Sequence, residues 1–242
     1  TIIGQATATI TDDDMTTLTV SSESGNEDDG SIMVTITSSN AVDGGFTVDV
    51  VKTDGLAKIA DTDYTGAFSD ATFTGAAGES QVFTVDPTVD TKVEADETVT
   101  VGLTNFVGTS VSFDLVDYDI DSEGTVDIIN DDQAVITIST PTGVDEGDAG
   151  DDTSVSFSVT MDNEVDVDID VDYSTIAGTA GVGLDYLAAG SNGTVTFAAG
   201  DFGSQTITIS IVEDDVVELA TETFDLALAD LAANNRNVIL EG

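Results

Sequence analysis

The chain contains no cysteine, no histidine and no tryptophan, and only two of its 242 residues are proline. Without cysteine it can form neither a disulfide nor a thiolate metal site. Without histidine it lacks the commonest general base and the imidazole ligands that suit zinc and copper. Any metal that this chain binds should therefore be held by oxygen atoms, which points to Ca²⁺ or Mg²⁺.

Positive charge is almost as scarce. Four Lys and Arg stand against 48 Asp and Glu, which gives a formal net charge of −44. Nucleic-acid binding is not expected, because contacts to phosphates need Lys and Arg. No apolar run has the length that a membrane-spanning helix requires. A folded chain this acidic repels itself strongly, and hard cations are the simplest candidates to neutralise it.

The chain is nevertheless not typical of a disordered polyanion, since 40% of its residues are hydrophobic and apolar residues alternate with polar ones. This period of two, rich in Thr, Val and Ile and interrupted by Gly, Asn and Asp, predicts β-strands. Seven short strands in roughly 115 residues indicate an all-β, immunoglobulin-like antiparallel sandwich. The expected strands are 15–21, 31–38, 45–53, 68–74, 80–86, 97–104 and 124–130, and then 133–140, 153–161, 165–174, 193–198, 204–212 and 222–229.

The pattern occurs twice. Asp63-Tyr64 matches Asp185-Tyr186, and the run from Glu97 to Leu103 matches the run from Glu222 to Leu228. Repeats of this length are typical of beads in an array rather than turns of a solenoid. We expect residues 1–14 to be the last strand of a preceding repeat, 15–132 to be a first repeat, and 133–242 to be a second repeat that lacks its final strand.

These landmarks resemble the Calx-beta domain. The second repeat carries, in order, Asp185-Tyr186, Gly193–Phe197, the run Asp214–Glu218 that begins with two aspartates, and Glu222-Thr223-Phe224. The first repeat carries Asp63-Tyr64, Asp90, Glu94, Glu97-Thr98-Val99 and Asn130-Asp131-Asp132. The resemblance extends over nearly the whole chain and implies two tandem seven-stranded sandwiches.

The resemblance also implies calcium binding at one end of each sandwich, through the loop after the first strand, the Asp-Tyr region, the loop before the sixth strand and the terminal Asp pair. Carried over to the first repeat, the implied ligands are Glu23, Asp63, Asp90, Glu94, Glu97, Asp131 and Asp132. In the second repeat they are Glu146, Asp185, Asp214, Asp215, Glu218 and Glu222. Sandwich topology brings these loops to one end, and Ca²⁺ takes six to eight oxygen ligands.

The two repeats differ in the loop before the sixth strand. Asp90 aligns with Asp214, but the next two positions hold Thr91 and Lys92 where the second repeat has Asp215 and Val216. The first repeat thus loses one acid and gains one cation. We expect it to bind fewer ions, or to bind them more weakly.

An alternative is that the loop acids form only a solvated surface. That is the preferred interpretation for Asp166, Asp168, Asp170 and Asp172, which alternate with apolar residues and are expected on the outer face of one strand. Enzyme activity is not expected. Paired carboxylates can hydrolyse glycosides, but aromatic residues make up only 6% of the chain and offer no sugar platform.

The predicted function is that of a calcium-binding structural module, which rigidifies an array in a bacterial adhesin or matrix protein located outside the cell or on its surface. The alternative is a calcium-sensing regulatory pair of a membrane exchanger-like protein. Neighbouring repeats of the same chain are the expected partners. Residues 4–11 are also expected to fill the vacant edge of the second repeat, within one chain or by strand exchange between chains.

Overall fold

A computed structural model describes residues 4–108, 118–119, 123–150, 152–188, 190, 192–217 and 221–241. The contacts divide the chain into two compact units. Unit 1 comprises residues 1–89 and 96–129, and unit 2 comprises residues 90–95 and 130–242. The chain therefore crosses between the units after residues 89, 95 and 129. Among the described residues, no helix is long and apolar enough to cross a membrane.

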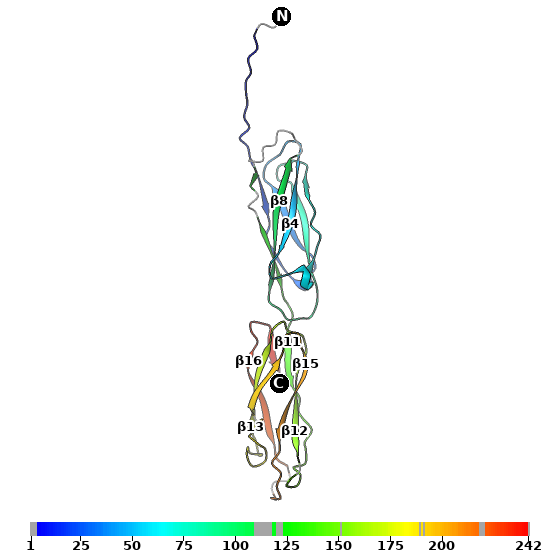
Figure 1. The fold of residues 1–242 in the computed structure, drawn as a ribbon, viewed down its shortest axis with the longest axis vertical. Coiled ribbons are helices and arrows are strands. Elements are labelled where there is room, and N and C mark those ends of the chain that lie inside the picture. Colours follow the sequence, from blue (N-terminus) through cyan, green and yellow to red (C-terminus); the bar gives the residue numbers. More distant parts are fainter. Residues whose placement is uncertain are drawn as a thin grey trace. The chain divides into compact units, whose positions relative to one another are not determined.

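Unit 1 is a sandwich of two sheets, with strand orders β5-β7-β3-β1-β9 and β2-β10-β8-β4-β6. In Figure 1, its strands β4 and β8 lie side by side, as their antiparallel pairing requires. The strands are β1 (Thr16–Val20), β2 (Glu23–Asn26), β3 (Ile32–Ser38), β4 (Phe46–Asp54), β5 (Tyr64–Thr65), β6 (Ala71–Phe73), β7 (Ser80–Pro87), β8 (Glu97–Gly108), β9 (Tyr118–Asp119) and β10 (Gly124–Ile129). Two 3₁₀ turns, η1 (Glu27–Asp29) and η2 (Ile59–Asp61), lie between strands.

Unit 2 contains a sheet ordered β15-β12-β11-β17 and a sheet ordered β14-β13-β16 (Figure 1). Its strands are β11 (Ala134–Ile138), β12 (Ser154–Met161), β13 (Ile169–Ala177), β14 (Asn192–Phe197), β15 (Gly203–Ser210), β16 (Phe224–Ala232) and β17 (Val238–Glu241). The all-β, tandem-sandwich prediction is confirmed. The short strands β2, β5, β9 and β17 were not expected from the sequence.

Each core follows the period-two pattern. In β12, the residues Val155, Phe157, Val159 and Met161 are buried, while the serines and threonines between them are more exposed. Burial of one such Val or Phe side chain stabilises the fold by about 1.5–3 kcal/mol. The inward-facing row of each strand therefore builds one core per unit.

One member of the unit 2 core comes from the sequence of the first repeat. Val93 has no exposed surface and packs in that core. Its backbone forms a parallel bridge with Val165, in which Val93 N–H donates to Glu164 O (2.8 Å) and Asp166 N–H donates to Val93 O (3.2 Å). The loop Asp90–Ala95 thus belongs to unit 2 by both hydrogen bonding and packing.

One expectation about the acidic strand was wrong. The strand predicted at 165–174 begins only at Ile169, and Asp166 does not lie on its outer face. Asp166 instead accepts two hydrogen bonds from Arg236. Asp170 and Asp172 do lie on β13, where their carboxylates accept hydrogen bonds from the cross-strand hydroxyls of Thr196 (2.6 Å) and Thr194 (2.5 Å).

Candidate metal centre

The Asp-Tyr loop is fixed in the same way in both units. Burial of the tyrosine holds the loop in place, since Tyr64 is 0% and Tyr186 1% exposed. The carbonyl oxygen of the preceding aspartate accepts a backbone hydrogen bond, from Thr88 to Asp63 (2.9 Å) and from Val212 to Asp185 (3.0 Å). Both donors stand two residues before the acidic loop. One hydrogen bond per repeat therefore ties the two candidate ligand loops together.

The aspartate that opens each acidic loop has matching geometry as well. Asp90 Oδ1 accepts the backbone N–H of Lys92 (2.7 Å), and Asp214 Oδ1 accepts that of Val216 (2.6 Å). In each case the hydrogen bond from the backbone N–H two residues later closes a local turn of a kind that Asp favours. It satisfies one carboxylate oxygen of each aspartate.

Two of the carboxylates predicted for the first repeat lie close together within unit 2. Asp90 and Asp132 each offer one carboxylate oxygen, and the two oxygens lie within 4.8 Å of each other. Asp132 is half-buried and Asp90 is exposed. Two carboxylates at this separation repel each other unless a cation joins them.

The donor set fits a hard cation. Both groups offer oxygen, with no nitrogen or sulfur, and Ca²⁺ accepts such ligands at flexible geometry. The cluster of Asp90 and Asp132 consists of two predicted ligands. In unit 1, Glu27 is an acid with only 6% exposure that was not predicted as a ligand. The run Glu27-Asp28-Asp29 was visible as a signal in the sequence, but nothing in the sequence indicated which of its acids is buried.

The other predicted ligands of the first repeat lie elsewhere. Glu23 is exposed on β2, and Glu97 begins β8 opposite Ile128. Asp63 Oδ2 accepts the backbone N–H of Lys58 (2.8 Å), and Glu94 forms a salt bridge with Lys92. Asp131, next to Asp132, is exposed. As ligands, these residues stay predictions.

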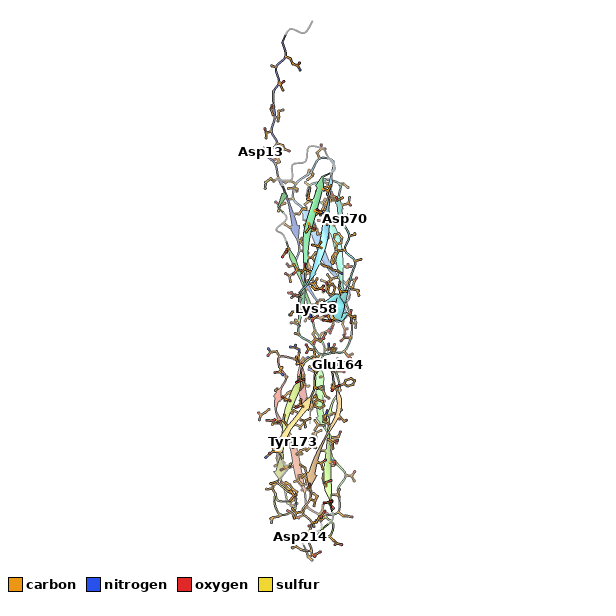
Figure 2. All side chains as sticks on the ribbon, viewed as in Figure 1. Asp13, Lys58, Asp70, Glu164, Tyr173 and Asp214 are labelled. Carbon is orange, nitrogen blue, oxygen red and sulfur yellow. The ribbon has the colours of Figure 1, made fainter. Side chains whose placement is uncertain are left out.

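In unit 2, three of the predicted ligands share one cavity. Glu146, Asp185 and Glu222 line a space of about 660 Å³ together with Asp145, Phe157 and Phe224. Asp185 Oδ2 accepts the backbone N–H of Gly181 (2.6 Å). Asp214 and Asp215 are not among the residues that line this cavity, and Glu218 lies outside the described residues. Figure 2 shows Asp214 and Glu164 at opposite ends of unit 2.

The end of unit 2 that carries Glu164 also holds two of the four cations in the chain. Lys92 forms its salt bridge with Glu94 there, and Arg236 pairs with Asp166. Desolvation lowers the pKa of Lys92, but Glu94, Glu164 and Asp166 outweigh it and raise the pKa overall. The hydrogen bond from Arg236 to Asp166 similarly raises the pKa of Arg236 against its desolvation. Both groups are therefore firmly protonated.

Comparison with protein families gives a match to the Calx-beta domain model at residues 10–132 and again at 129–242. The chain belongs to the Calx-beta domain family. The two matched ranges share residues 129–132, which include Asn130, Asp131 and Asp132. The boundaries predicted after residues 14 and 132 stay predictions.

Among solved structures, the chain is similar to CBD12 from CALX1.2, with 19% identity over 89% of this chain and 80% of that one, at a TM-score of 0.41. It is similar to the apo form of the Calx CBD1 domain, with 21% identity over 49% of this chain and 100% of that one, also at 0.41. The calcium binding domain CBD12 of CALX1.1 gives 18% identity over 89% and 80%, at 0.40. A search of curated proteins returned no match.

Proposed function

We propose that this pair of Calx-beta domains binds Ca²⁺ through the acids at the domain ends and serves as a stiffening segment of an extracellular or surface protein of the adhesin or matrix type. The observation that carries the proposal is the cluster of Asp90 and Asp132 in unit 2, whose carboxylate oxygens lie within 4.8 Å of each other. In a chain with a net charge of −44, such a group is costly without a bridging cation.

The mechanism is electrostatic. Without the ion, Asp90 and Asp132 repel each other and loosen the segments on which they lie. Asp90 belongs to the loop that carries Val93, and Asp132 directly precedes β11. An ion bound by both carboxylates would fasten this loop to the start of the second domain's first strand.

The expected energies are modest for each ion but add up over several sites. Extracellular calcium modules typically have Kd values of about 10⁻⁴–10⁻³ M. At ten to a hundred times Kd, one ion that binds only the folded state adds about 1.4–2.7 kcal/mol to the free energy of unfolding. In a domain of roughly 100 residues, each ~1 kcal/mol raises Tm by about 4–8 °C.

The test compares thermal unfolding with Ca²⁺, with Mg²⁺ and with chelator, together with calorimetric titration of Ca²⁺. The variant Asp132→Asn removes one cluster oxygen charge, and Asp127→Asn makes the same charge change at an exposed position of β10. We expect Ca²⁺ to raise Tm of the unmodified chain and of Asp127→Asn, with a smaller rise for Asp132→Asn. Equal Ca²⁺ responses in the two variants, or none in the unmodified chain, would rule the cluster out.

The same titration separates this function from calcium sensing by an exchanger-like protein. A sensor needs Kd values of about 10⁻⁷–10⁻⁵ M, whereas a stiffening module works in the range given above. The cation Lys92 in the first domain's loop, where it pairs with Glu94, supports the weaker range.

A further inference from the structure

A short loop from the sequence of the first domain folds as part of unit 2. The Calx-beta match to the first domain covers residues 10–132, yet Asp90–Ala95 belongs to unit 2. The strands on either side of this loop are β7, which ends at Pro87, and β8, which begins at Glu97, and both belong to unit 1. The chain therefore leaves unit 1, contributes to unit 2 and returns before the first domain is complete.

The loop is held in unit 2 by one apolar side chain and by backbone hydrogen bonds. Val93 has no exposed surface and packs in the unit 2 core. Its N–H donates to Glu164 O (2.8 Å), and its carbonyl oxygen accepts the N–H of Asp166 (3.2 Å). The side-chain amide of Asn130 donates to the carbonyl oxygen of Lys92 (3.1 Å). If the loop leaves unit 2, these hydrogen bonds and the burial of a valine are lost together.

The loop also brings its own cation. Lys92 forms a salt bridge with Glu94, and the charges of Glu164 and Asp166 attract its ammonium group as well. In a chain with a net charge of −44, this ammonium group is a counter-ion that the chain itself supplies. The part of the loop around Val93 therefore has an electrostatic reason to stay in unit 2 when no metal ion is bound.

The core of unit 1 does not use this loop. Among the described residues, the buried cluster of unit 1 includes Val85 of β7 and Val99 of β8 but no residue from 90 to 95. Val89, the last residue before the loop, is 60% exposed. Unit 1 therefore holds the two ends of the loop, while unit 2 receives its packing.

Holding both ends changes the entropy cost of placing the loop. While unit 1 is folded, β7 and β8 fix the ends, so only a short segment has to be ordered when Val93 enters the unit 2 core. When unit 1 is unfolded, the same residues lie within a long flexible chain. Placing them in unit 2 then costs the additional entropy of closing a longer loop. The loop should therefore stay in unit 2 less firmly once unit 1 has unfolded.

We propose that the Asp90–Ala95 loop couples the folding of the two domains. Unit 2 has its full stability only while unit 1 is folded, because unfolding of unit 1 releases Val93 and Lys92 from unit 2. A coupling free energy is reciprocal, so a folded unit 2 stabilises unit 1 by the same factor. Domains that share only a linker have no such coupling and unfold independently. The device uses groups of the chain alone and does not depend on the proposed calcium binding.

The test uses whole chains in which a charge placed in one core keeps that unit unfolded. Val34→Asp does this in unit 1 and Val159→Asp in unit 2, because neither side chain has any exposed surface. NMR spectra verify which unit is folded. Urea unfolding and hydrogen exchange of core amides then measure the stability of the remaining unit. Every chain is measured in the presence of chelator, so that the result is independent of calcium.

A further variant removes the loop from unit 2 without unfolding unit 1. Val93→Asp places a charge where the valine is buried, and Val89→Asp places the same charge at the exposed residue just before the loop as the matched control. Val93→Ala keeps the backbone hydrogen bonds and takes the place of Val93→Asp if that variant prevents unit 2 from folding. It should then reduce the coupling rather than abolish it.

We expect Val34→Asp to raise the unfolding constant of unit 2 by roughly tenfold or more, which corresponds to ~1.4 kcal/mol. Val159→Asp should raise the unfolding constant of unit 1 by the same factor. In the Val93→Asp background the stability of unit 2 should no longer depend on whether unit 1 is folded, whereas Val89→Asp should leave the full effect.

The proposal is overturned if unit 2 is equally stable whether unit 1 is folded or unfolded. It is also overturned if the coupling persists in Val93→Asp, because the linker rather than the loop would then carry it. Different factors in the two directions would count against the loop as well, since one shared contact must act equally on both units.

Discussion

Arg236 holds both carboxylate oxygens of Asp166, with Nε donating to Oδ1 at 2.6 Å and Nη2 donating to Oδ2 at 2.8 Å. The two side chains are only 14% and 25% exposed. A two-pronged bond of this kind is stronger and more directional than a pair formed by lysine. Asp166 in turn donates its backbone N–H to Val93. The bond therefore supports the segment on which the Asp90–Ala95 loop rests.

Replacing Arg236 should destabilise unit 2. Arg236→Gln leaves the partly buried Asp166 carboxylate without its charged partner, and we expect a loss of about 1.5–3 kcal/mol in the free energy of unfolding. Arg236→Lys keeps the positive charge but loses the paired hydrogen bond, so its loss of unfolding free energy should be smaller. Urea unfolding of the three chains measures the order. A lysine variant as unstable as the glutamine variant would contradict the role of the paired bond.

Because Val93 is buried in the core of unit 2, we predict that this one side chain from the first repeat stabilises that unit. Val93→Ala should lower its free energy of unfolding by roughly 1–3 kcal/mol, since the side chain is fully buried. Val89→Ala, at a residue that is 60% exposed, is the matched control and should change little. Hydrogen exchange of the Asp166 amide, which donates to Val93 O, should also accelerate in Val93→Ala alone.

These two residues show what sequence patterns could and could not predict. The period-two strands and the two sandwiches could be predicted, because burial of one strand face imposes the pattern locally. The role of Val93 could not, because one valine within an acidic loop does not indicate which core receives it. Asp166 was misjudged for a similar reason, since its partner Arg236 lies 70 residues away in sequence. In the candidate metal centre, Asp90 and Asp132 were implied as ligands by the resemblance to the Calx-beta domain, whereas the burial of Glu27 in unit 1 is a tertiary effect.

Tyr64 should make unit 1 sensitive to alkali. Burial, and then the hydrogen bond from its hydroxyl to Asp54 Oδ1 (2.6 Å), raise the pKa of Tyr64 well above its ordinary value. Because the folded-state pKa is the higher one, this stabilisation is complete below the unfolded-state pKa of about 10 and is lost as pH rises beyond it. Tyr64→Phe should cost about 1–2 kcal/mol at neutral pH and reduce the loss of stability in alkali. Urea unfolding at neutral and alkaline pH measures both effects; equal alkaline losses in the two chains would contradict the prediction.

Glu79 should have the opposite pH dependence. Its carboxylate accepts the backbone N–H groups of Thr74 (2.9 Å), Gly75 (3.1 Å) and Ala76 (3.3 Å), as well as the Thr74 hydroxyl (2.9 Å). The bond from the Thr74 backbone is the main cause that lowers the pKa of Glu79. The contribution of the Glu79 carboxylate to stability is therefore present above its unfolded-state pKa and is lost as pH falls through its lower folded-state pKa. An NMR titration should place the Glu79 midpoint below that of an ordinary glutamate. Glu79→Gln should loosen the turn at neutral pH, while Asp70→Asn at a nearby exposed acid should not.

Lys92 should weaken calcium binding by the first domain. Its ammonium group pairs with Glu94, and its backbone N–H donates to Asp90. A positive charge is therefore held beside the carboxylates that would bind the ion. Lys92→Gln removes that charge and releases Glu94 as a further oxygen ligand. We expect Ca²⁺ to bind roughly tenfold more tightly, which is ~1.4 kcal/mol. Lys58→Gln makes the same change in net charge at an exposed lysine paired with Asp61, and should leave the affinity nearly unchanged. Calorimetric titration of the three chains at one ionic strength separates a general effect of net charge from a local effect at the site. A gain in affinity from greater overall acidity would appear in both variants, whereas a gain from the local change would appear only in Lys92→Gln.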